Sequence, residues 1–215
     1  MKKKGVVTIM KYHYVVIERE YGSAGTEIGK KLSEISGIPC YGAEILERVS
    51  AKLNIGIDQI EQYEEKTTNS FLYSIYLMGK VNEGTDGNLS KEGLIYLEEQ
   101  NVIRGLAEEG PAVFVGRCAA NALEDRNDVL RVFIHADKNL RKKRAVEEYK
   151  ISQNRADAVI QKFDRKRSSY FSANTGKDWR DLSNYHLVLD SGKLGIGSCA
   201  AILWNAMAKE QGGAS

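Results

Sequence analysis

The chain has few of the residues that build metal centres and disulfide frameworks. It contains 3 cysteines and 3 histidines in 215 residues, and the histidines do not cluster with the cysteines. Cys40, Cys118 and Cys199 stand far apart, and no pair of them has the spacing of a metal-binding motif. This scarcity excludes a small disulfide-stapled secreted module and favours a reducing, cytoplasmic environment.

Long apolar runs and an excess of one charge are also missing. No stretch approaches the roughly 20 apolar residues that a membrane-spanning helix needs. The net charge is +2, from 31 basic and 29 acidic residues, which is too small for general affinity for nucleic acids. Neither a membrane nor a nucleic acid is therefore expected as a partner.

The domain organisation is expected to be simple. The apolar run that follows Lys2–Lys4 is too short for a signal peptide, so residues 1–10 are interpreted as a flexible extension. Residues 11–215 show no repeat and no dividing linker, and their length suits one domain with a sizeable core.

One stretch near the N-terminus gives the clearest indication of the fold and of a binding site. Val15–Ile17 is a short apolar run that predicts a buried strand. A turn of small residues, 22–25, follows it. Ile28, Leu32 and Ile35 then recur at the spacing of one helix face. A strand, a glycine-containing loop and a helix in this order aim backbone N–H groups at a bound anion.

The loop departs from the Walker A motif, in which a lysine contacts the terminal phosphates and a hydroxyl binds magnesium. Aligning Gly25 with the glycine before that lysine puts Thr26 in the lysine's place and Ile28 in the place of the hydroxyl. The loop thus predicts phosphate binding with two groups missing, and an ordinary strand–helix turn is the alternative. Arg19, Lys30 or an arginine of a lid are candidates to supply the missing charge.

Strands and helices are expected to alternate along the remaining chain. Further strands are predicted at 38–41, 112–116, 129–135 and 185–190, and helices at 43–53, 90–108, 140–149, from Ser152 onward, and at 196–209. The alternation predicts an α/β fold with a parallel sheet and helices on both faces. The apolar, aromatic run 71–78 predicts packing against the core or against a second copy of the chain in a homo-oligomer.

Basic residues gather where such a fold would bind a ligand. Arg117 comes directly after the apolar strand 112–116, and ligands of open α/β sheets bind beyond the carboxyl ends of strands. Residues 141–144 and 164–167 add basic clusters on two successive helices. These cations predict stabilisation of a transferred phosphoryl group, although most of them also suit a solvated helix face.

Several stretches together resemble the cytidylate kinase-like family, a branch of the P-loop nucleoside monophosphate kinases. They are 19–25, 115–118, 129–134, 175–179, 184–190 and 194–196. The resemblance covers nearly the whole chain from Tyr14 and implies a P-loop kinase fold with a five-stranded parallel sheet. It also implies a helical substrate-binding insert at about 42–110 and a basic lid at about 138–175.

The resemblance implies roles for three groups of residues, together with ATP and Mg²⁺ as cofactors. No protein ligand to the metal is assigned. The nucleotide loop would be Gly22, Ser23, Ala24, Gly25 and Thr26; the acceptor would be held by Arg48, Arg117 and Asp164; and the catalytic cations would be Arg19, Arg141, Arg144 and Arg167.

Departures from the family pattern leave more than one function as a candidate. Thr26 replaces the Walker lysine, while Gly42 and Cys118 replace aspartates. The retained arginines favour a kinase that transfers the γ-phosphate of ATP to CMP, dCMP or a related small acceptor. The missing groups favour a catalytically impaired protein that binds a nucleotide or another anion and regulates. A third reading is a generic α/β protein that binds phosphate only incidentally.

Overall fold

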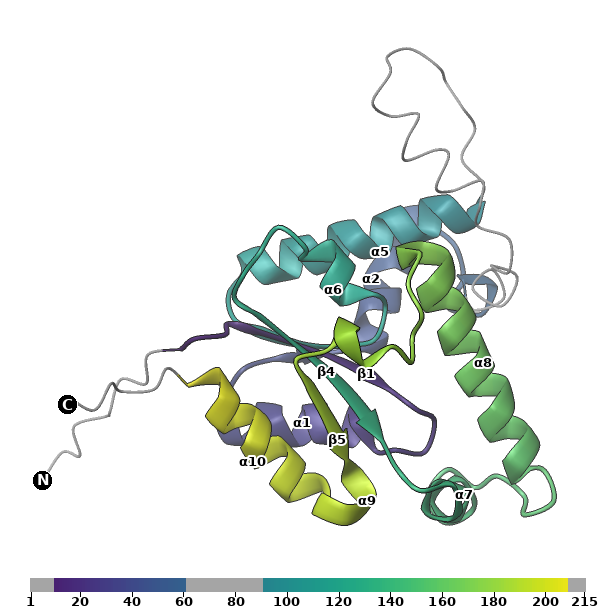
Figure 1. The fold of residues 1–215 in the computed structure, drawn as a ribbon. Coiled ribbons are helices and arrows are strands. Elements are labelled where there is room, and N and C mark those ends of the chain that lie inside the picture. Colours follow the sequence, from purple (N-terminus) through teal and green to yellow (C-terminus); the bar gives the residue numbers. More distant parts are fainter. Residues whose placement is uncertain (1–9, 61–90, 209–215) are drawn as a thin grey trace, which may run out of the picture.

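The computed structural model describes residues 10–60 and 91–208, and the fold is given for these (Figure 1). The predicted packing of the run 71–78 and the extension up to residue 9 lie outside the described residues, as does the middle of the predicted insert. Within the described part, no helix combines the length and apolarity that crossing a bilayer requires.

A five-stranded sheet, parallel throughout, forms the centre of the molecule, and this confirms the predicted fold class. Its order is β2-β3-β1-β4-β5, so the first strand lies in the middle. The strands are β1 (Tyr14–Arg19), β2 (Cys40–Tyr41), β3 (Ala112–Val115), β4 (Val129–His135) and β5 (Leu187–Asp190). The central place of β1 explains why its apolar residues are buried on both faces.

Helices cover both faces of the sheet (Figure 1). One face carries α2 (Ala43–Leu53), α5 (Lys91–Glu108) and α6 (Ala119–Ala122), whose apolar side chains pack on Val16 and Phe114. The other face carries α1 (Gly25–Ser36) and α10 (Ile196–Met207), which pack on Val15 and Ile17. The short α9 (Ser191–Leu194) links β5 to α10.

A helical pair lies at the carboxyl end of the strands. It consists of α7 (Lys138–Glu147) and the long α8 (Ala156–Thr175), which stands beside the sheet in Figure 1. A 3-10 turn, η1 (Leu182–Asn184), then leads into β5. The two basic helices predicted from the sequence are therefore present and close the edge at which ligands of such sheets bind.

Two local predictions were wrong. Ile35 is 44% exposed because it lies in the last turn of α1, just before the left-handed cap Gly37. Ser152 does not cap α8, which begins at Ala156 with Arg155 as its N-cap residue.

Candidate functional site

The loop between β1 and α1 ends in an uncapped helix N-terminus. Ser23 donates from both its backbone N and its Oγ to the carbonyl of Glu20, at 3.3 and 2.9 Å, and Ala24 adopts a left-handed conformation with φ of 60°. No side chain of the described residues caps α1, so its first N–H groups lack a partner within the helix. A helix start of this kind attracts an anion.

The carbonyl side of this loop is tied to α7 and α9. Arg141 Nε donates to the Tyr21 carbonyl at 2.7 Å, and Arg144 Nη1 donates to the Gly22 carbonyl at 3.2 Å. Ser191 Oγ donates to the next carbonyl, that of Ser23, at 2.6 Å. Gly22 has φ of 77°, and a Cβ there would lie 2.8 Å from the Arg141 carbonyl, so only glycine fits. Arg141 and Arg144 thus brace the loop in this structure.

Arg141 is also the centre of a buried ionic cluster. It is 6% exposed, its Nη1 lies 3.0 Å from Glu20 Oε2, and its Nη2 pairs with Asp164. Asp164 Oδ1 accepts the backbone N–H of Tyr21 at 2.7 Å. The structure therefore places Asp164 as an anchor between the loop and the two basic helices.

Arg19 crosses from the loop to the end of β3. Its Cβ and Cγ lie where a Cβ on Gly25 would clash, and its Nη1 lies where a Cβ on Gly116 would clash. Its Nε is buried with no hydrogen-bond partner among the described residues. Burial, together with the like charges of Arg167 and Arg117, lowers the pKa of Arg19 to about 9. This excess of positive charge suits an anionic ligand.

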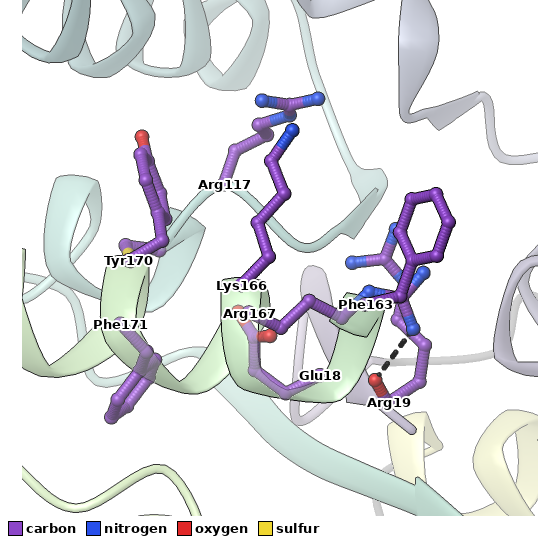
Figure 2. Close-up of a pocket in the computed structure, with 9 residues that line it drawn as sticks. Glu18, Arg19, Arg117, Phe163, Lys166, Arg167, Tyr170 and Phe171 are labelled. Atoms are coloured by element: carbon purple, nitrogen blue, oxygen red, sulfur yellow. Dashed lines mark hydrogen bonds between the residues drawn. The ribbon is translucent and has the colours of Figure 1, made fainter. Parts of the chain in front are cut away.

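Two adjoining hollows meet at Arg19 and Arg167. The loop hollow lies in front of residues 20–27 and is closed on one side by Tyr149. The central pocket, of about 150 Å³, is shown in Figure 2. It is lined by Glu18, Arg19, Arg117, Cys118, Phe163, Lys166, Arg167, Tyr170 and Phe171. Because Arg19 and Arg167 line both hollows, they lie between whatever occupies the two.

Aromatic side chains hold α8 against the loop. The ring of Tyr21 stacks on Phe163 with centroids 4.6 Å apart, and Arg167 lies over the Tyr21 ring at 5.8 Å. Arg167 Nη1 also donates to the Arg19 carbonyl at 2.9 Å, the dashed line in Figure 2. Burial lowers the pKa of Arg167. Its guanidinium is thus held in place at the junction of the hollows.

Arg117 is held by a buried acid that sequence reasoning missed. Its Nη1 lies 3.3 Å from Glu99 Oε1, and Tyr170 donates its hydroxyl to the other oxygen of Glu99. Glu99 is fully buried, and burial raises its pKa to about 8. The signal was available: Glu99 lies four residues after Ile95 and three before Val102, on the apolar face of its helix.

The acid at position 99 makes stability depend on pH. Its folded pKa of about 8 lies above its ordinary value, so folding favours the protonated form, and this contribution is lost as pH rises from about 4.5 through 8. Glutamine at position 99 carries no titratable proton, so Glu99→Gln should lack this loss of stability at high pH. The free energy of unfolding of Glu99→Gln minus that of wild type is expected to be about 2–4 kcal/mol larger at pH 9 than at pH 5. Denaturant unfolding at both pH values measures this.

The exposed Glu108 on the same helix provides the matched control, Glu108→Gln. Parallel stability curves for wild type and Glu99→Gln would show that Glu99 is ionised in the folded protein throughout this range.

Two basic residues expected at the site lie away from it. Arg48 is exposed, pairs with Glu109 at 3.4 Å and lines neither hollow. Lys30 is also exposed, and its charge acts on Cys40 and Glu44 beside β2. Lys30 is therefore not folded back over the loop, whereas Arg19 is. Thr26 lines the loop hollow.

Comparisons with known proteins agree with this architecture. The model of the cytidylate kinase-like family matches residues 14–193. No curated protein gave a match.

Solved structures share the fold at low sequence identity. An uncharacterized protein from Eubacterium ventriosum ATCC 27560 has 24% identity and a TM-score of 0.67, over 90% of this chain and 97% of that one. Shikimate kinase from Bacteroides thetaiotaomicron has 12% identity and a TM-score of 0.50, over 89% and 96%. TT1252 from Thermus thermophilus has 15% identity and a TM-score of 0.50, over 93% and 98%.

Proposed function

The chain belongs to the cytidylate kinase-like family, and from that premise we propose that it is a phosphotransferase using ATP. The acceptor is CMP, dCMP or a related small molecule. The observation that carries the proposal is the meeting of the loop hollow and the central pocket at Arg19 and Arg167. Phosphoryl transfer needs a donor site and an acceptor site with fixed positive charge between them.

Each hollow suits one reactant. The triphosphate of ATP fits the loop hollow, where the uncapped start of α1 provides backbone N–H groups, whereas the N–H of Ser23 is already bonded to the Glu20 carbonyl. The acceptor fits the central pocket, where Arg117 and Lys166 provide cations for an anionic group. Arg19 and Arg167 then flank the phosphorus atom that moves, and their fixed charges stabilise the equatorial oxygens in the transition state.

Magnesium fits the oxygen-rich side of the loop hollow. Thr26 and Glu27 line it and carry a hydroxyl and a carboxylate, and oxygen donors are those that magnesium prefers. When bound, the ion would neutralise charge on the bridging phosphate oxygens. Tyr149 donates to Glu27 Oε1 at 3.0 Å and so orients that carboxylate.

A regulatory, non-catalytic protein is the second candidate. The observation that favours it is the engagement of Arg141 and Arg144 with loop carbonyls, which leaves Arg19 and Arg167 as the cations shared by the hollows. Such a protein would bind ATP without turnover. For either candidate we place the protein in the cytoplasm, where ATP is available and the three free thiols stay reduced.

ATP consumption with magnesium and each of CMP, dCMP, UMP, AMP and non-nucleotide acceptors tests the proposal. We expect turnover with one acceptor, and a fall of about 100-fold or more in kcat/KM for that acceptor in Arg117→Ala, with KM for ATP nearly unchanged. Arg165→Ala, an exposed arginine on α8, is the matched control. Saturable ATP binding with no turnover would transfer support to the regulatory candidate.

A further inference from the structure

Glu18 is a buried acid that the phosphate chemistry described above does not use. It lies one residue before Arg19 on β1, is 6% exposed, and lines the central pocket (Figure 2). It also lines a second polar cavity of about 260 Å³, the inner hollow, which shares Glu18, Cys118 and Phe171 with the central pocket. It does not line the loop hollow. Glu18 therefore stands on the acceptor side of the pocket.

One of the two carboxylate oxygens of Glu18 has a hydrogen-bond partner in the protein. Trp179 donates its indole N–H to Glu18 Oε2 at 3.3 Å, which fixes the side chain. Among residues 10–60 and 91–208, this is the hydrogen bond found for the carboxylate, and the charges of Arg19, Arg167 and Arg117 act on it as well. An acid that is buried without a full set of partners costs free energy, so it is a candidate for a role with a ligand.

We propose that Glu18 accepts the proton of an acceptor hydroxyl group, so that the acceptor is a small anionic alcohol rather than a nucleoside monophosphate. This rests on the proposed phosphoryl transfer from ATP, and it narrows the acceptor of that proposal from CMP and dCMP to a related small molecule. The hydroxyl would lie beside Glu18 Oε1, and the anionic group of the same molecule would lie on Arg117 and Lys166, across the central pocket. A pocket of about 150 Å³ holds one ring-sized molecule, since benzene fills an engineered cavity of that size.

The acceptor hydroxyl gives its proton to Glu18 while its oxygen forms a bond to the γ-phosphorus of ATP. The bond between that phosphorus and the β,γ-bridging oxygen breaks, and ADP leaves with the electron pair. The products are a phosphate monoester and ADP, and protonated Glu18 returns its proton to water.

Charge argues against a phosphate nucleophile at the same place. The attacking oxygen of a nucleoside monophosphate is already an anion and needs no base, and a carboxylate beside it would repel it. A hydroxyl, in contrast, gains from a carboxylate that accepts its proton. Burial raises the pKa of Glu18, which moves this acid toward the range in which a general base works near neutral pH.

Glu18→Gln provides the test, because the amide keeps the size of the side chain and an oxygen for Trp179. Wild type and variant are assayed with MgATP against D-glycerate, glycerol 3-phosphate and ribose 5-phosphate, and against CMP and dCMP. We expect wild type to phosphorylate a hydroxyl probe and Glu18→Gln to lose 100-fold or more in kcat with KM for ATP unchanged. Glu124→Gln, an exposed acid of the inner hollow, is the control.

The pH profile distinguishes a base from a structural residue. The groups that face Glu18 are Arg19, Arg117, Arg167, Cys118 and Tyr185. The acid limb of kcat/KM in wild type is expected to vanish in Glu18→Gln and to persist in Glu124→Gln. Glu18→Asp keeps the charge and is the control for misfolding. It is expected to retain the acid limb of the kcat/KM profile at a lower kcat.

Three results would overturn the inference. Turnover of CMP or dCMP that Glu18→Gln leaves unchanged would refute it while the proposed function stands. Turnover of a hydroxyl probe with the same acid limb in Glu18→Gln would assign the proton to another group. No turnover with any acceptor would refute both this inference and the kinase proposal.

Discussion

Replacing Arg19 with methionine is expected to weaken ATP binding and, at the same time, to stabilise the ligand-free protein. Arg19 lines both the loop hollow and the central pocket, so its loss removes a cation from each, and affinity for MgATP should fall about 10–100-fold. Stability should rise by about 0.5–2 kcal/mol, because the side chain carries a partly buried charge beside two other arginines, and its Nε has no partner among the residues that the structure describes.

Isothermal titration with MgATP and thermal unfolding without ligand measure the two effects on the same preparation. Arg19→Lys keeps a charge and is expected to keep part of the affinity. Arg165→Met removes an exposed arginine from α8 and should change neither quantity. A destabilised Arg19→Met protein would mean that Arg19 stabilises the loop in the ligand-free protein and is not a residue kept for binding an anion.

Replacing Asp164 with alanine is expected to destabilise the protein by about 3 kcal/mol or more. The change removes the partner of the buried Arg141 and the acceptor for the Tyr21 N–H. Glu20 still pairs with Arg141 at 3.0 Å, but the buried guanidinium then keeps one acid in place of two, and an uncompensated buried charge is costly.

Denaturant unfolding compares this variant with Asp157→Ala on the same helix. Asp157 pairs with Lys142 at 2.5 Å, and the side chain of Asp157 is 41% exposed, so its loss should destabilise the protein much less than the loss of Asp164. Asp164→Asn, which keeps an oxygen for Tyr21, should fall between the two. Similar losses for Asp164→Ala and Asp157→Ala would show that the buried cluster contributes little.

Local sequence patterns were sufficient to predict most of the helices and strands. The apolar run of β1, the small-residue turn and the periodicity of α1 each depend on neighbouring residues, and the structure forms them where they were expected. The prediction of α2 matches its observed bounds, and β4 likewise. Errors arose at helix ends and at helix starts, where exposure at Ile35 and capping at Ser152 depend on surroundings that periodicity does not report.

The chemistry of the site depended on contacts between distant residues. Arg141 was expected as a catalytic cation and Asp164 as a residue that holds the acceptor, yet they pair with each other and hold the loop, from positions 23 residues apart. Glu99 supports Arg117 across 18 residues, and Trp179 reaches Glu18 across 161. The sequence alone does not distinguish a charged residue that stabilises a loop from one that contacts a ligand.

The sequence by itself determined that this protein has a parallel α/β sheet, a strand–loop–helix unit that presents N–H groups, and a family membership. These follow from periodicity and from short motifs, which are local. Only the tertiary structure decided which cations reach the junction of the two hollows and which acids are buried beside them. Burial, desolvation and pairing depend on what the fold brings within a few ångströms, and residues as far apart as Arg19 and Arg167 meet only there.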